Sequence, residues 1–222
     1  MNDEEAINLL KTDLKFTVND IDKLEKFRNL LLNYNSKHNL ISKTTENAIW
    51  CRHILDSAQL LKFFNINSNA KLVDLGTGAG FPGLILSLFN KNNQFHVKLY
   101  EKSPVKRDFL AVIKKELKLD FEIGGNIYNS TIEADIIVCR AFKKLDQIIK
   151  ISREMVTKKH KIIILKGKNA QAEINNVSLG HNYSYKLEKS ITNNDSKIIL
   201  IEVVQNASQI HNSSHKPKGR SR

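Results

Sequence analysis

The stretch "KLVDLGTGAGFPGLILSLF" (residues 71–89) places four glycines within eight positions, between one apolar run and another. The first run is typical of a buried strand, and the run at 84–89 is typical of a helix. At the carboxyl edge of a parallel sheet, a glycine-rich turn between a strand and a helix lets a nucleoside or phosphate approach backbone N–H groups. The stretch therefore predicts a nucleotide site on an α/β fold, with Pro82 in the first helical turn.

Short apolar runs alternate with amphipathic stretches along the rest of the chain beyond residue 70. This alternation favours a mainly parallel sheet with right-handed crossovers. Strands are expected at 71–75, 96–101, 134–139, 161–166 and 197–204.

The region before the glycine-rich stretch has a helical pattern. One helix is expected after the cap candidates Asn19 and Asp20, and a second from Thr44 or Thr45 to residue 64. The apolar stripe of the first comprises Leu24, Phe27, Leu31 and Tyr34. We therefore expect three parts, namely a helical extension (1–66), a sheet domain (67–205) and a basic tail (206–222).

Length and composition limit the class of protein. The 222 residues, 41% of them hydrophobic, suffice for one domain and a modest extension. Because no stretch approaches about 18 uninterrupted apolar residues and the N-terminus is acidic, we expect no membrane segment and a cytoplasmic protein. Cys51 and Cys139 are far apart in sequence, so both are expected to be reduced thiols in the core, and no metal site is predicted.

The formal net charge of +12 and the pI near 9.6 favour a polyanionic partner. An A/T-rich genome would also produce many lysines without any selection for binding. Basic residues at strand ends and in the following turns together form a candidate rim for phosphate, although each taken alone is better explained as a solvated surface charge. They are Lys102, Lys106, Arg107, Lys143, Lys144, Lys166 and Lys168.

The glycine turn by itself does not identify the nucleotide. Gly78, Gly80 and Gly83 satisfy G-x-G-x-x-G, and Glu101 follows 18 residues later, where an acid would hold ribose hydroxyls. Asp74 favours S-adenosylmethionine, because its carboxylate would attract the cofactor's amino group and repel a pyrophosphate. A dinucleotide and a purely structural turn remain as alternatives.

Five segments together resemble the glucose-inhibited division protein B family over residues 20–204. They are "NLISKTTENAIWCRHILDSAQLL" (39–61), "VDLGTGAGFPG" (73–83), "KRDFL" (106–110), "VCRAF" (138–142) and "ILKGK" (164–168). Members of this family methylate N7 of a guanosine in small-subunit ribosomal RNA. The resemblance implies a class I, Rossmann-like methyltransferase sheet of seven mostly parallel strands, with an N-terminal helical extension and S-adenosylmethionine as cofactor.

The resemblance also implies which residues form the site. Cofactor contacts are expected from Gly76, Phe81, Ile127, Tyr128 and Arg140. Asp74, Gly78, Gly80 and Glu101 belong to the same pocket by the general logic of the fold. The sequence departs from the family at "NIYN" (126–129), because Tyr128 stands where relatives usually carry an acid.

Guanine N7 presents an unprotonated lone pair, so the reaction needs positioning and no general base. We expect Arg140, at the end of the fourth strand, to link cofactor and guanosine, and His53, which shares a helix face with Asp56, to stand with Arg52 at the mouth of the site. A salt bridge and a structural histidine are the alternatives, and Cys139 is not expected to react. The expected partner is small-subunit rRNA or the 30S subunit, and the protein is expected to be a monomer. Other readings are another RNA target, an NAD-dependent oxidoreductase, and a ribosome-binding protein without activity.

Overall fold

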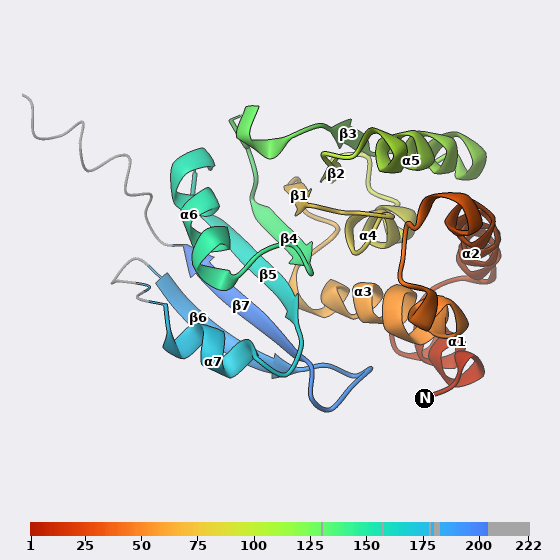
Figure 1. The fold of residues 1–222 in the computed structure, drawn as a ribbon, viewed down its shortest axis with the longest axis horizontal. Coiled ribbons are helices and arrows are strands. Elements are labelled where there is room, and N and C mark those ends of the chain that lie inside the picture. Colours follow the sequence, from red (N-terminus) through yellow and green to blue (C-terminus); the bar gives the residue numbers. More distant parts are fainter. Residues whose placement is uncertain (130, 157, 178, 180–182, 204–222) are drawn as a thin grey trace, which may run out of the picture.

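The computed structural model describes residues 1–203, except 130, 157, 178 and 180–182. Within these residues seven strands form one sheet in the order β3-β2-β1-β4-β5-β7-β6 (Figure 1). Neighbouring strands from β3 to β5 run parallel, and β7 runs antiparallel to both β5 and β6. The expected mostly parallel α/β sheet is confirmed. The strands are β1 (Lys71–Leu75), β2 (His96–Tyr100), β3 (Glu122–Gly124), β4 (Ile136–Arg140), β5 (His160–Lys166), β6 (Tyr183–Lys189) and β7 (Lys197–Val203).

Helices cover both faces of the sheet (Figure 1). Apolar side chains of the central strands alternate between the two faces, so that Leu72 joins one core cluster and Val73 the other. The first cluster packs against α1 (Asp3–Thr12), α2 (Val18–His38), α4 (Gly83–Phe89) and α5 (Pro104–Leu117), and the second against α6 (Leu145–Met155) and α7 (Ala170–Asn175).

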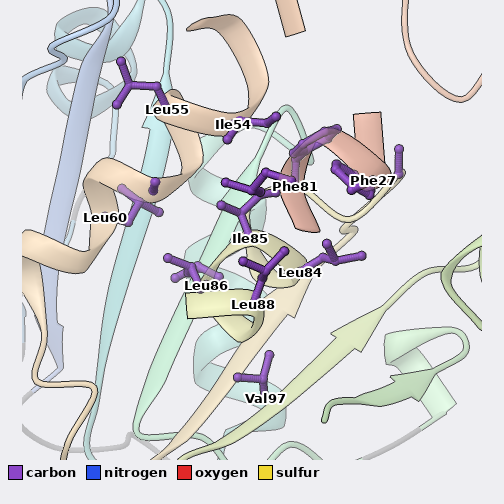
Figure 2. Packing of buried hydrophobic residues seen from close by; sticks show 14 of the residues in the cluster. Phe27, Ile54, Leu55, Leu60, Phe81, Leu84, Ile85, Leu86, Leu88 and Val97 are labelled. Atoms are coloured by element: carbon purple, nitrogen blue, oxygen red, sulfur yellow. The ribbon is translucent and has the colours of Figure 1, made fainter. Parts of the chain in front are cut away.

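The N-terminal helices share the first core cluster with α4. Figure 2 shows Phe27 of α2 and Ile54 beside Phe81 and the α4 residue Ile85. The rings of Phe27 and Phe81 meet edge to face, 5.6 Å apart. The glycine-rich turn is therefore packed against the N-terminal region. The expected division at residue 66 stays a prediction, and the expected tail at 206–222 lies outside the described residues.

Two helix predictions were wrong in detail. The first concerns the start of α2, whose N-cap is Thr17 and not Asn19 or Asp20. The Thr17 hydroxyl accepts the Asp20 N–H at 3.2 Å, and the Asp20 carboxylate accepts the Thr17 N–H at 3.0 Å. This reciprocal capping box satisfies two backbone donors and places Asp20 in the first turn.

The second correction concerns the regular helix expected from Thr44 or Thr45 to residue 64. The segment instead changes type repeatedly, as a 3-10 helix (Lys43–Ala48), a π-helix (Trp50–Leu55), the short α3 (Asp56–Ala58) and a 3-10 helix (Gln59–Phe63). Five of the six π-helical residues are buried, because the wider turn presents more consecutive side chains to the core. His53 is one of them, and the turn directs it to the end of β4.

Candidate functional site

A cavity of about 560 Å³ lies at the carboxyl ends of β1, β2 and β4. This volume is within the range of about 300–1,000 Å³ that is usual for small-molecule sites. Both residues expected to act on the substrate, His53 and Arg140, line it. Six more of the expected cofactor residues do so too, namely Gly76, Gly78, Phe81, Glu101, Ile127 and Tyr128. The topology thus brings together residues from five separate segments of the chain.

The glycine turn leaves β1 through backbone conformations that favour glycine. Gly76 has φ +71°, and a Cβ there would lie 2.3 Å from the Phe142 ring. Gly78 has φ +62°, and a Cβ there would meet no atom within 4 Å. Gly76 is therefore required by its close contact, whereas Gly78 leaves room for a ligand to approach its backbone.

Glu101, which directly follows β2, is fixed by backbone N–H groups. Its Oε2 accepts the Gly78 N–H at 3.0 Å and its Oε1 accepts the Ser103 N–H at 2.8 Å. Each carboxylate oxygen retains a further lone pair. The side chain is 7% exposed and lines the cavity, so it has the position and chemistry to accept hydrogen bonds from ribose hydroxyls.

Asp74 and Gly80 do not line the cavity. Asp74 is fully buried behind the turn, where its Oδ2 accepts the Gly83 N–H at 2.8 Å and holds α4 to β1. Burial raises the pKa of Asp74 to about 7. The geometry therefore gives this carboxyl a structural contact at the turn and no direct contact with the cavity.

Ile127 and Tyr128 follow β3 and form another wall. Ile127 is buried and presents an apolar surface. Tyr128, at the position where the sequence departs from the family, is 58% exposed, and the Lys143 ammonium lies 5.9 Å from its ring centroid. The pair Ile127 and Tyr128 suits an aromatic base better than a charged group.

Arg140 ends β4 and reaches three neighbours. Its Nη1 donates to the Arg52 carbonyl at 2.8 Å, its Nη2 donates to His53 Nδ1 at 2.7 Å, and Asp56 Oδ2 lies 3.7 Å away. The guanidinium also lies 4.9 Å from the Phe81 ring centroid. Arg140 is thus fixed between the π-helix and the glycine turn.

The contacts of His53 determine its tautomer. Because the Arg140 guanidinium only donates, Nδ1 must accept, so Nε2 carries the proton and donates to Thr45 Oγ1 at 2.9 Å. Burial first, then the charges of Arg140 and Arg52, lower the pKa of His53 to about 3. The ring is therefore neutral at physiological pH, and its basic nitrogen is already occupied.

Asp56 joins this group to the turn between β6 and β7. Its Oδ1 accepts from the Thr192 hydroxyl at 2.8 Å and from the Gln59 amide at 2.9 Å. Gln59 in turn accepts the Ile191 N–H at 3.0 Å. The sequence pointed to Asp56 through its shared face with His53, but it carried no signal for Thr192, which lies 136 residues away.

The expected phosphate rim divides into two groups. Lys166 is bound to Glu173 and to the Lys143 carbonyl at 2.8 and 2.9 Å, and the Arg107 guanidinium donates to the carbonyls of Glu101 and Lys102. The side chains of Lys166 and Arg107 therefore stabilise the fold through contacts within the protein. The other members make no side-chain hydrogen bond or ion pair with a described residue, and these are Lys102, Lys106, Lys143, Lys144 and Lys168.

Both cysteines are free and buried, as expected. Burial raises the pKa of the Cys139 thiol, which makes it a poor nucleophile. In the part of the chain that the structure describes, no group of three or more acidic, histidine or cysteine side chains is arranged to hold a metal ion. No helix among the same residues is long and apolar enough to cross a membrane.

Comparisons with known proteins agree on one family. The profile of the family described as rRNA small subunit methyltransferase G matches residues 20–201. A protein of Orientia tsutsugamushi (strain Ikeda) named ribosomal RNA small subunit methyltransferase G is 35% identical over 201 residues, which are 90% of this chain and 99% of that protein. A protein of the same name from Rickettsia prowazekii (strain Madrid E) is 36% identical over 182 residues, 82% and 93% of the two chains. In fold, the chain is similar to a SAM dependent methyltransferase from Aquifex aeolicus, with a TM-score of 0.54, 13% identity and coverage of 68% and 90%.

Proposed function

The chain belongs to the rRNA small subunit methyltransferase G family, and from this premise we propose that it methylates N7 of a guanosine in small-subunit ribosomal RNA, using S-adenosylmethionine. Family membership leaves the dinucleotide-dependent oxidoreductase without support. The observation that carries the proposal is the cavity at the carboxyl ends of β1, β2 and β4, which has Glu101 at one wall and Arg140 at another.

The cavity residues suit the parts of the cofactor. Glu101 would accept the ribose hydroxyls, Ile127 and Tyr128 would flank the adenine, and the open space beside Gly78 would admit the nucleoside to the backbone. S-adenosylmethionine supplies a methyl group bound to a positively charged sulfur. Asp74 lies behind the turn, so its proposed contribution is to hold the turn in place.

The reaction asks the protein to position two groups. The guanine N7 lone pair forms the new N–C bond while the S–C bond breaks, the sulfur keeps that electron pair, and the positive charge moves to the base. No proton is transferred, so a general base is not needed. This agrees with His53, whose Nδ1 is occupied by Arg140. We propose that His53 is a positioning residue for Arg140, and that Arg140 contacts the reacting groups.

Further features of the function follow from the substrate. We propose that the protein acts as a monomer on rRNA within the 30S subunit or its precursors. Bacterial ribosomes are assembled in the cytoplasm, so we propose that compartment. Lys102 and Lys106 line the cavity and make no side-chain hydrogen bond or ion pair with a described residue, so they would meet the phosphates of the RNA.

The test is methyl incorporation from labelled S-adenosylmethionine into 30S subunits that lack the modification, followed by mapping of the modified base. We expect label on N7 of a single guanosine. Label on another base or another RNA would change the target. Binding of S-adenosylhomocysteine without label on any RNA would overturn the proposal and favour a ribosome-binding protein without activity.

A further inference from the structure

A second cavity of about 360 Å³ lies beside the first, and the cofactor contacts leave it unassigned. It is enclosed by the segment that carries His53, by the end of β5 and by the turn between β6 and β7. Thr45, Arg52, Asp56, Gly167 and Thr192 are among its lining residues, and none of these five lines the first cavity. The second cavity is thus a distinct space with its own chemistry.

The two cavities adjoin, because His53, Arg140 and Ala141 line both of them. Ala141 has φ +49°, a conformation that residues other than glycine seldom adopt and that is often found at functional sites. Its methyl side chain adds little bulk at the border between the cavities. A methyl acceptor must come within about 3–3.5 Å of its donor, so the acceptor must occupy a space that adjoins the cofactor cavity, as this one does.

The lining of the second cavity complements a purine nucleotide. The Arg52 side chain is exposed and makes no hydrogen bond or ion pair with a described residue. Asp56 Oδ1 is taken by Thr192 and Gln59, whereas the one contact of Oδ2 with a described residue is that with Arg140 at 3.7 Å. An arginine donates to guanine O6 or to a phosphate, and a carboxylate oxygen accepts from the N–H groups of a base.

We infer that the second cavity receives the acceptor guanosine, turned out of the RNA, with N7 at the border that this cavity shares with the first at His53, Arg140 and Ala141. This inference rests on the proposed function and adds the place of the substrate base. Arg52 is then a substrate-binding residue, and the turn between β6 and β7 is part of the substrate site.

Two glycines allow each cavity to be filled separately. Gly167 lines the second cavity and Gly125 lines the first. A Cβ at either would meet no atom within 4 Å, and neither residue has φ in the left-handed region. Gly167→Leu and Gly125→Leu therefore make a matched pair that adds the same side chain to different cavities.

The experiment measures the Kd for S-adenosylhomocysteine by calorimetry and methyl transfer to unmodified 30S subunits. For Gly167→Leu we expect an unchanged Kd and a fall in kcat/KM for the RNA of about 100-fold or more. For Gly125→Leu we expect the Kd to rise about tenfold, as for a loss of about 1.4 kcal/mol. Wild-type transfer by Gly167→Leu, or a Kd weakened as in Gly125→Leu, would overturn the inference.

Two further measurements keep the inference separate from the proposed function and from misfolding. Should wild-type protein label no RNA, the proposed function fails, and the cavity is tested by NMR line broadening of guanosine 5′-monophosphate added to protein saturated with S-adenosylhomocysteine. We expect wild-type protein to broaden the nucleotide signals and Gly167→Leu not to do so. Equal broadening by the two proteins, or no broadening by wild type, contradicts the site.

The control for misfolding is thermal unfolding of Gly167→Leu. Should this variant fail to unfold cooperatively on heating, Arg52→Ala replaces it in both assays. We expect a KM for RNA raised about fivefold at unchanged cofactor affinity, or weaker broadening, and wild-type behaviour would overturn the site.

Discussion

Arg140 is the residue on which the site converges. Its guanidinium donates to a backbone carbonyl and to His53, and faces both Asp56 and the Phe81 ring. These contacts come from the π-helix, from the first residue of α3 and from the glycine turn, so the arginine joins parts of the site that are distant in sequence. A lysine has one ammonium group in place of the planar fork and would not reproduce them.

We expect Arg140→Met to reduce methyl transfer by about 100-fold or more and to raise the pKa of His53 above its value of about 3. That pKa should stay below the ordinary 6.5, because burial is the larger cause and remains. Kinetics and an NMR titration of the His53 ring measure the two effects. Arg153→Met is the control, because this arginine also lies 4.9 Å from an aromatic ring, that of Tyr183, but outside the cavity. Unchanged turnover in Arg140→Met would refute the role.

Asp74 predicts a pH-dependent difference in stability. Its folded pKa of about 7 lies above the ordinary 3.8, so between pH 4 and 7 the folded state binds more protons than the unfolded state. Stability from this group is therefore lost as the pH rises through that window. Asn does not titrate. We therefore expect the free energy of unfolding of Asp74→Asn to rise relative to that of wild type by about 2–4 kcal/mol as the pH is raised from 4.5 to 7.5. Urea unfolding of both proteins across this pH range measures the change. The titration of His53 contributes equally to both proteins, so it does not affect the difference between them. A constant difference across this range would contradict the raised pKa.

At the scale of elements, the start of α2 offers a separate test of stability. We expect Thr17→Ala to lower the free energy of unfolding by about 1 kcal/mol, because the capping box with Asp20 is lost. The neighbouring Val18 is 70% exposed, and Val18→Ala should change stability by less than about 0.5 kcal/mol. Urea unfolding compares the two. Equal effects would show that the box does not stabilise α2, and S-adenosylhomocysteine should bind both variants as it binds wild type.

The elements differ in how far the sequence predicts them. The strands β1, β4 and β5 are buried on both faces and appear as apolar runs, so they were found within two residues of their ends. The strand β6 was missed because it is an edge strand. All seven residues of "YSYKLEK" are exposed or half-buried, and its alternation of apolar with polar residues is limited to Tyr183, Tyr185 and Leu187. The π-helix was missed because it packs against α1, which is distant in sequence, and no local pattern marks that packing.

In the candidate site, too, the features that are local in sequence were predicted, and those that depend on tertiary packing were not. The glycine turn and Glu101 are local in sequence and follow from spacing alone. The bond of Lys166 to Glu173 and that of Thr192 to Asp56 depend on how the elements pack, so no sequence pattern marked them. The cofactor roles of the cavity residues stay predictions, and the placement of Asp74 behind the turn changes the contact expected of it.

At the scale of the whole molecule, the excess of positive charge predicts how RNA binding responds to salt. Each neutralised phosphate contributes about 0.7 to the slope of log affinity against log salt for single-stranded RNA. Lys102 is exposed, lines the first cavity and has no side-chain partner among the described residues. We expect Lys102→Ala to lower the slope by about 0.7. Lys115, near the far end of α5, is the control, and Lys115→Ala should leave the slope unchanged. Equal slopes for wild type, Lys102→Ala and Lys115→Ala would show that Lys102 does not neutralise a phosphate of the RNA.

The bond between Asp56 and Thr192 also determines when the protein becomes competent during its synthesis. The glycine turn, Glu101 and Arg140 all leave the ribosome before Thr192, and the contact closes a loop of 136 residues. Closing so long a loop comes late in folding, because its entropy must be offset by contacts already formed. An unfinished chain would therefore have the glycine turn and the partners of Arg140, but Asp56 would lack its bond to Thr192 and the second cavity would be incomplete. If the second cavity receives the guanosine, we expect a chain that stops short of the β6–β7 hairpin to bind cofactor without modifying RNA.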